Sequence, residues 1–257
     1  MKQRLVLICT LLLILLCGCT VRTELKYLET SVTHEYIGAV TLRSEMEYDE
    51  AGNQTAFIQY RDGEEFSRIT YTHTDGEILG EITQGAQAGT IRQVYEQDAD
   101  GNITRLEMYV DNELYSLTES TYDTNGNVLT SVQKTIPGDI TTTTTYVYDE
   151  NSNPIRVTYD FDGAGTVTEN SYDSAGRLVS AVTYDLLGHL TARKEHTWNE
   201  AGVELVSTYN PADERTETIA KTYDEAGNLL TAETYGPEGN LTLRTTYTYQ
   251  KIKIPVK

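Results

Sequence analysis

The sequence predicts an all-β fold: an elongated, twisted or coiled antiparallel meander of successive β-hairpins. A Tyr-Asp-x-x-Gly pattern recurs along the chain, and the segments between its copies are rich in Thr, Val and Tyr, which favour strands. The aromatic residues that open the later turns, at positions 122, 148, 172, 198 and 223, are separated by 26, 24, 26 and 25 residues. One repeat therefore contains two strands and two turns.

Each Asp-x-x-Gly segment is expected to form a tight turn. The Asp carboxylate accepts a hydrogen bond from a backbone N–H two residues later, and Gly adopts the left-handed conformation that a side chain resists. The clearest turn residues are Tyr48, Asp49, Gly52, Tyr122, Asp123, Gly126, Tyr172, Asp173, Gly176, Tyr223, Asp224 and Gly227. Residues 198–202 form an altered copy, in which Trp and Asn replace Tyr and Asp.

Residues of the same parity share one face of a strand, so Leu229 and Tyr235 lie on a common Leu/Tyr face. Glu217 and Lys221 interrupt that face, and the opposite face is rich in Thr. Neither face has the continuous apolar run of a sheet covered on both sides. We therefore expect a single layer of about 16 or 17 strands, at one strand per ~12 residues. The basic segment 251–257 is typical of a blocked edge strand.

The first residues predict export and attachment to a membrane. A basic start precedes the apolar run Leu5 to Leu16, which at about a dozen residues is too short to span a bilayer. Gly18-Cys19 resembles the lipobox of bacterial lipoproteins, in which the cysteine is lipidated and becomes the N-terminus. We expect lipid on Cys19 and an extracytoplasmic location, anchored to the cell membrane or envelope. A secretory signal with an incidental cysteine and an uncleaved anchor are the alternatives.

Three segments follow from these features: a signal peptide at 1–18, a lipidated tether with an irregular first strand at 19–43, and one repeat domain at 44–257. Cleavage before Cys19 removes two basic residues and no acidic one, so the formal charge changes from −19 to −21. It also leaves one cysteine, which excludes an intrachain disulfide. A surface this acidic repels nucleic acid.

In phase over about 200 residues, the Tyr-Asp-x-x-Gly-[Asn/Arg]-Leu series resembles the YD-repeat (RHS-type) proteins. The residues that carry the resemblance lie at 122–128, 172–178 and 223–229. It implies hairpins of a continuous, spiralling sheet in an extracellular setting, with repeats that are not catalytic and that in some members bind carbohydrate. The chain is too short to close the hollow shell of the large members.

No catalytic constellation and no cofactor motif is visible, and the chain is not expected to be an enzyme. The four histidines, at positions 34, 73, 189 and 196, lack metal-ligand spacing and are expected to be exposed strand or turn residues. Residues 96–107 match much of a calcium-binding loop, although they lie in phase with the repeat. Asp98 and Asp100 are therefore weak calcium candidates beside the simpler interpretation as a turn.

The functional hypothesis from sequence is non-enzymatic binding or adhesion through an extended sheet surface lined by Tyr and Thr, with a glycan or surface protein as partner. Tyrosine suits this role because it combines an apolar ring with a hydroxyl group. The alternatives are a structural spacer or envelope scaffold without a ligand, and a remnant of an RHS-type toxin shell.

Overall fold

The computed structural model describes residues 26–84 and 89–252, which form one 18-stranded antiparallel sheet. The strands are β1 (Lys26–Tyr36), β2 (Thr41–Tyr48), β3 (Gln54–Arg61), β4 (Glu64–Thr74), β5 (Glu77–Gln84), β6 (Gly89–Gln97), β7 (Ile103–Val110), β8 (Glu113–Tyr122), β9 (Val128–Thr135), β10 (Ile140–Tyr148), β11 (Pro154–Phe161), β12 (Ala164–Tyr172), β13 (Leu178–Asp185), β14 (Leu190–Trp198), β15 (Glu204–Tyr209), β16 (Arg215–Tyr223), β17 (Leu229–Tyr235) and β18 (Leu241–Ile252). Within these ranges no helix is long and apolar enough to cross a membrane.

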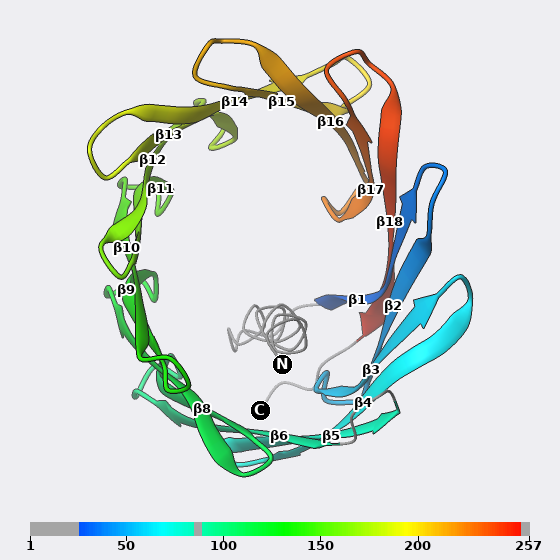
Figure 1. Cartoon of the computed structure of the whole chain (residues 1–257), viewed down its shortest axis with the longest axis vertical. Coiled ribbons are helices and arrows are strands. Elements are labelled where there is room, and N and C mark those ends of the chain that lie inside the picture. The colour runs from blue at the N-terminus through cyan, green and yellow to red at the C-terminus, as the bar shows by residue number, and fades with distance from the viewer. Residues whose placement is uncertain (1–25, 85–88, 253–257) are drawn as a thin grey trace.

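The sheet closes into a barrel. Each strand pairs with its neighbours in the chain, and β1 also pairs with β18 along a seam from Lys26↔Ile252 to Tyr36↔Leu243. Figure 1 shows the closed wall, viewed down the barrel. The predicted meander of hairpins is therefore confirmed, whereas the open, elongated sheet is wrong. β18 pairs with β17 over residues 241–246 and with β1 over residues 243–252, so residues 251–252 of the predicted edge strand are paired on one side, with β1. The domain boundary expected at residue 44 falls inside β2.

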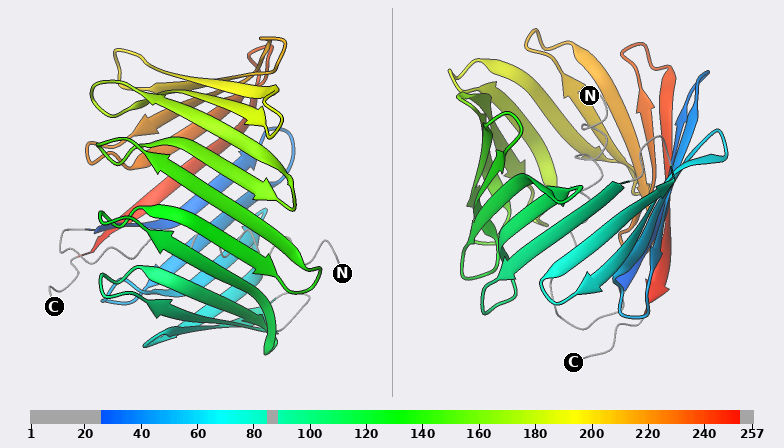
Figure 2. Two further views of the ribbon diagram at one scale, coloured as in Figure 1. Left: turned by 90° about the vertical axis from the view of Figure 1, so that its left-hand side faces the viewer. Right: turned by 60° about the horizontal axis from the view of Figure 1, so that its bottom comes forward.

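Repeated β-bulges help to explain why the sheet curls. Tyr223 pairs with Leu229 while Thr222 pairs with Thr231, which leaves one extra residue on β17. The same shift occurs at Tyr122 and Tyr172. A bulge bends its strand and increases the local twist, and a strongly twisted sheet of this size removes its two exposed edges by closing. Figure 2 shows the strands inclined across the wall, with turns at both rims.

The turns that follow the even-numbered strands form one rim, which we call the aspartate rim. In the turn after β16, Asp224 Oδ1 accepts the N–H groups of Ala226 and Asn228 at 2.9 and 2.8 Å, and Gly227 N donates to Asp224 O at 3.0 Å. Gly227 has a φ of +85°. The same carboxylate-to-backbone bonds are made by Asp49, Asp98, Asp123, Asp149 and Asp173. Local hydrogen bonding thus fixes where each hairpin reverses.

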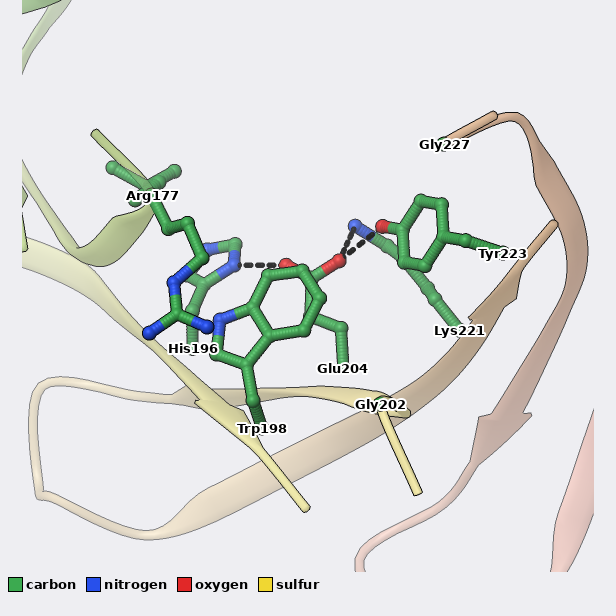
Figure 3. A pocket seen from close by; sticks show the side chains of 9 residues that line it. Arg177, His196, Trp198, Gly202, Glu204, Lys221, Tyr223 and Gly227 are labelled. Atoms are coloured by element: carbon green, nitrogen blue, oxygen red, sulfur yellow. Dashed lines mark hydrogen bonds and ion pairs between the residues drawn. The ribbon is translucent and has the colours of Figure 1, made fainter. Parts of the chain in front are cut away.

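The inner face of the wall can be identified from Trp198, Lys221 and Tyr223. Figure 3 shows their side chains converging from strands that curve around them, so they lie on the concave side of the sheet. The strand register then places most of the buried apolar residues on this face as well, among them Met46, Phe57, Ile69, Ile91 and Met108. The core is therefore a layer on the inner wall rather than the filling of a sandwich.

The outer face carries a ladder of ion pairs. Arg105 Nη2 lies 2.7 Å from Glu107, and its guanidinium also lies within 4.0 Å of Glu96 and Glu119. Further outward pairs are Arg43–Glu45, Arg68–Glu47, Arg92–Glu77, Arg156–Glu169, Arg193–Glu195 and Arg244–Glu233. Ile58, 2% exposed, pairs directly with Glu45 and Arg68 on this side. Long charged side chains thus flank the apolar residues that face outward.

Candidate functional site

A recess lies in the inner wall near the aspartate rim and has a volume of about 600 Å³. Its lining residues are Arg177, Leu178, His196, Trp198, Gly202, Glu204, Lys221, Tyr223 and Gly227. Among the ion pairs between strand residues in the described chain, only those of Glu204 lie on the inner face. We call this site the charged recess.

A second recess, of about 350 Å³, occupies the matching place 101 residues earlier in the chain. We call it the uncharged recess. Three positions are the same residue type in both recesses, namely Gly101 and Gly202, Tyr122 and Tyr223, and Gly126 and Gly227. Two other matched positions differ in charge: Glu204 replaces Ile103, and Lys221 replaces Ser120. The same backbone framework therefore holds an ionic cluster in one recess and none in the other.

Strand register brings the charged residues together. Trp198 pairs with Glu204 across β14 and β15, and Glu204 pairs with Lys221 across β15 and β16. Directly paired residues in antiparallel strands have Cβ atoms about 5 Å apart on the same face. The register depends on the altered turn, in which Asn199 Oδ1 accepts the N–H groups of Ala201 and Val203 at 2.9 and 3.0 Å.

Glu204 is the centre of the cluster. Its side chain is 7% exposed, its Oε1 accepts a hydrogen bond from His196 Nδ1 at 2.6 Å, and its Oε2 lies 3.4 Å from Lys221 Nζ. Oε2 also accepts the Tyr223 hydroxyl. In regular repeats the matching hydroxyl donates to a backbone carbonyl instead, as Tyr122 does to Ile103 at 2.6 Å. In this repeat the Tyr223 hydroxyl therefore donates to the Glu204 side chain instead of to a backbone carbonyl of a neighbouring strand.

The cluster favours the ionised form of Glu204. Burial alone would raise the pKa of this carboxyl group, but the hydrogen bonds from Tyr223 and His196 and the charge of Lys221 outweigh it, so the pKa lies below its ordinary value. Burial and the bond to Glu204 raise the pKa of Tyr223. At neutral pH the recess therefore contains a carboxylate whose charge is already compensated by neighbouring donors.

Aromatic rings form another side of the charged recess. The Trp198 and Tyr223 ring centroids are 6.0 Å apart with an interplanar angle of 33°. The Arg177 guanidinium carbon lies 5.4 Å from the Trp198 ring centroid, and Asp173 holds that guanidinium at 2.7 Å. Trp198 Nε1 is buried and has no hydrogen-bond partner among the described residues. The site therefore offers an apolar ring surface beside hydrogen-bond donors that the protein does not fully use.

Of the residues singled out in the sequence, the turn residues Tyr223 and Gly227 line the charged recess, whereas the calcium candidates do not. Cys19 is outside the described residues. At the aspartate rim, Asp98 Oδ1 accepts the N–H groups of Asp100 and Asn102, both at 2.9 Å. The described residues contain no group of three or more His, Cys, Asp or Glu placed to hold a metal ion, and weak calcium binding stays a prediction.

The expectation that all four histidines are exposed is wrong for His196, whose side chain is 9% exposed. His34 and His73 are part-buried and bond to Thr245 Oγ1 and the Gln54 carbonyl, at 3.0 and 2.6 Å. Glu204 was not predicted as a site residue, although two signals in the sequence pointed to it. The Trp198 turn departs from the repeat, and Lys221 is a charged residue with the parity of Tyr223. The predicted common face of Leu229 and Tyr235 is wrong, because the bulge after Leu229 puts the two residues on opposite faces.

Solved structures resemble the chain, whereas no family model and no curated protein matches it. A porin-like protein from Bacteroides vulgatus ATCC 8482 is 14% identical, covers 88% of this chain and 99% of its own, and has a TM-score of 0.49. A porin-like protein from Bacteroides uniformis ATCC 8492 is 13% identical over 89% of this chain and 99% of its own, with a TM-score of 0.37. TcdB2-TccC3-TEV is 11% identical over 82% of this chain and 15% of its own, with a TM-score of 0.25.

The closed wall corrects the YD-repeat identification. The seam between β1 and β18 closes the wall of the described residues into a barrel. The identification as a YD-repeat protein that binds through an open sheet is therefore wrong, and so are its alternatives of a spacer and a toxin-shell remnant with that open sheet. The extracytoplasmic location stays an expectation from the sequence, and lipid attachment concerns Cys19, which lies outside the described residues.

Proposed function

We propose that the chain is a non-enzymatic, extracytoplasmic barrel that stays outside the bilayer and binds a small molecule in its lumen. The observation that carries the proposal is the opposite chemistry of the two faces. The outer face presents paired arginines and glutamates, whereas the inner face holds apolar residues and the charged recess. A volume of about 600 Å³ lies in the range of small-molecule sites.

The energetic cost of the outer charges argues against lipid around this wall. An arginine on the lipid face costs about 2–4 kcal/mol at the bilayer midplane and about 0–1 kcal/mol near its surfaces. Seven outward arginines take part in the ladder of ion pairs, several of them, such as Arg43, Arg68 and Arg193, well inside their strands. Their summed cost is on the order of 10 kcal/mol, comparable with the whole stability of a domain.

The charged recess also favours binding over catalysis. A general acid or base works best when its pKa lies near the working pH. The pKa of Glu204 is instead lowered, and both carboxylate oxygens already accept hydrogen bonds. Such a carboxylate is suited to holding the side chains of His196 and Tyr223 in place.

Protease cleavage of the tether tests the position of the barrel. A specific protease site inserted directly after Cys19 in the full chain should let the protease release a folded barrel from washed membranes into detergent-free buffer. A barrel that spans the bilayer would stay with the membrane after complete cleavage, and conductance in planar bilayers would then identify it as a pore.

Attachment through lipid on Cys19 is a separate proposal, supported by the basic start, the apolar run and Gly18-Cys19. Cys19→Ala should shift the protein from the membrane fraction to the soluble extracytoplasmic fraction, or leave the precursor uncleaved. Cys9→Ala is the matched control, because Cys9 lies inside the expected signal peptide, and it should not change the distribution. A Cys19→Ala protein that matures and remains with the membrane contradicts the proposal.

A further inference from the structure

Hydrogen-bond donors outnumber free acceptors in the charged recess. Both oxygens of Glu204 are used within the wall. Lys221 has three N–H donors and one contact with Glu204, at 3.4 Å. Trp198 Nε1 is buried without a partner among the described residues, and a buried donor left unpaired costs free energy. A molecule that supplies acceptor oxygens would satisfy the free N–H groups of Lys221.

The groups that remain free at the recess also favour an anion over a cation. Arg177 and Lys221 both carry positive charge at the recess, and each has an acidic partner, so their sum with Asp173 and Glu204 is close to neutral. A cationic ligand would add a third positive charge without finding a free carboxylate oxygen. Arg177 already lies over the Trp198 ring, which therefore has less face to offer a cation. A carboxylate would instead meet donors that are already in place.

The remaining surface is suited to a ring. Trp198 and Tyr223, inclined at 33°, offer aromatic surface on the inner wall, and Leu178 adds an aliphatic side chain. The uncharged recess keeps the matching tyrosine but has Gln97 and Ser120 where the charged recess has Trp198 and Lys221. The indole ring of Trp198 and the ammonium group of Lys221 thus occur together beside the altered turn at residues 198–202.

We propose that the charged recess binds a small ring compound carrying a carboxylate, with the ring against Trp198 and the carboxylate within reach of Lys221. This inference deepens, and rests on, the proposed binding of a small molecule in the lumen. It assigns the ligand class from the unused donors, the balance of charge and the aromatic surface.

Trp198 is the single tryptophan of the chain, so its fluorescence reports on the recess directly. Titrating the full chain with benzoate or cyclohexanecarboxylate should change tryptophan emission in a saturable way. Benzamide should bind more weakly, and benzylammonium should cause no saturable change. Lys221→Gln should weaken benzoate binding by about tenfold, which corresponds to about 1.4 kcal/mol.

Two variants control for general effects on the barrel. Ser120→Gln alters the uncharged recess, and Lys194→Gln removes an inward lysine that does not line the charged recess; both should leave benzoate binding unchanged. Thermal unfolding of Lys221→Gln shows whether the variant is folded. The inference is overturned if benzylammonium binds and benzoate does not, if no probe alters the emission of the folded protein, or if folded Lys221→Gln binds benzoate as tightly as the parent. The proposed function fails separately, when the barrel remains in the membrane after cleavage of its tether.

Discussion

The charged and uncharged recesses are two versions of one site, 101 residues apart in the same wall. Gly101 and Gly202 have φ values of +85° and +76°, and Gly126 and Gly227 have values of +84° and +85°. The backbone is thus nearly the same while Glu204 and Lys221 replace Ile103 and Ser120. The difference shows that the regular repeat provides the backbone of the site. Charged side chains are found where one repeat departs from the regular sequence.

Glu204→Ile, which copies the uncharged recess, should produce the largest change. It removes the acceptor for His196, Lys221 and Tyr223 together, and groups left unpaired in a buried site are costly. We expect the free energy of unfolding to fall by about 2–3 kcal/mol, less than for a fully buried pair because Lys221 can turn toward water. Denaturant unfolding measures it.

Glu169→Ile on the outer face is the control for that variant. Glu169 lies 3.6 Å from Arg156, and both side chains are 52% exposed. An exposed pair contributes about 0–1 kcal/mol, so this change should cost less than Glu204→Ile. Equal losses for the two variants would mean that the inner cluster is no more important to the fold than a surface pair.

Gly227→Val and Gly126→Val should cause a smaller, matched loss, since both glycines have left-handed φ values and valine resists that conformation. We expect about 1–2 kcal/mol for each. An added Cβ meets no atom within 4 Å at Gly227 and only Asn102 Oδ1 at 3.5 Å in the case of Gly126, so packing does not separate them. Hydrogen exchange should show lost protection near the changed hairpin. A large difference between the variants would refute the equivalence of the two backbones.

The smallest expected effect is a difference in acid sensitivity. The folded pKa of Glu204 lies below its ordinary value, so its stabilising contribution is complete above about pH 4.5 and is lost as the pH falls through the lowered pKa. Glu204→Gln should remove this part of the pH dependence while the turn aspartates keep theirs. Unfolding free energies of both proteins, measured between neutral and acidic pH, should therefore converge in acid. A difference in unfolding free energy that stays the same at every pH would contradict the lowered pKa of Glu204.

Local features of the fold were predictable because they are encoded within a few residues. The turn at Asp224 and Gly227 depends on hydrogen bonds spanning four residues. The simple alternation of faces was wrong across each bulge, since the extra residue on β17 places Leu229 and Tyr235 on opposite faces. Closure was not predictable in this way. It depends on pairing between β1 and β18. An irregular first strand was expected within residues 19–43, but no local pattern there marks the last strand as its partner. The repeated bulges, which add twist, also have no distinct residue type.

The site was partly visible in the sequence. The altered turn at Trp198 and the charge of Lys221 two residues before Tyr223 both stand out, but their meaning depends on the register that pairs Trp198, Glu204 and Lys221. His196 has no special spacing, and the pairing of β14 with β15 is what places it on the same face as Glu204. Equivalent positions of the two repeats, set side by side, do single out Glu204 opposite Ile103, because a charge there replaces an aliphatic side chain.

The seam has a consequence for how the protein is made. Thr30 Oγ1 donates to Thr248 O at 3.2 Å across a separation of 218 residues, so the closing strands are almost the first and last of the described chain. Contacts between residues so distant in sequence form slowly. Most of the chain must lose conformational entropy before these contacts contribute any stabilising free energy. Until then the growing sheet has two bare edges, which invite pairing with other chains. Assembly of the barrel is therefore complete only when β18 has arrived, and the interval before it is when the chain is most exposed to aggregation.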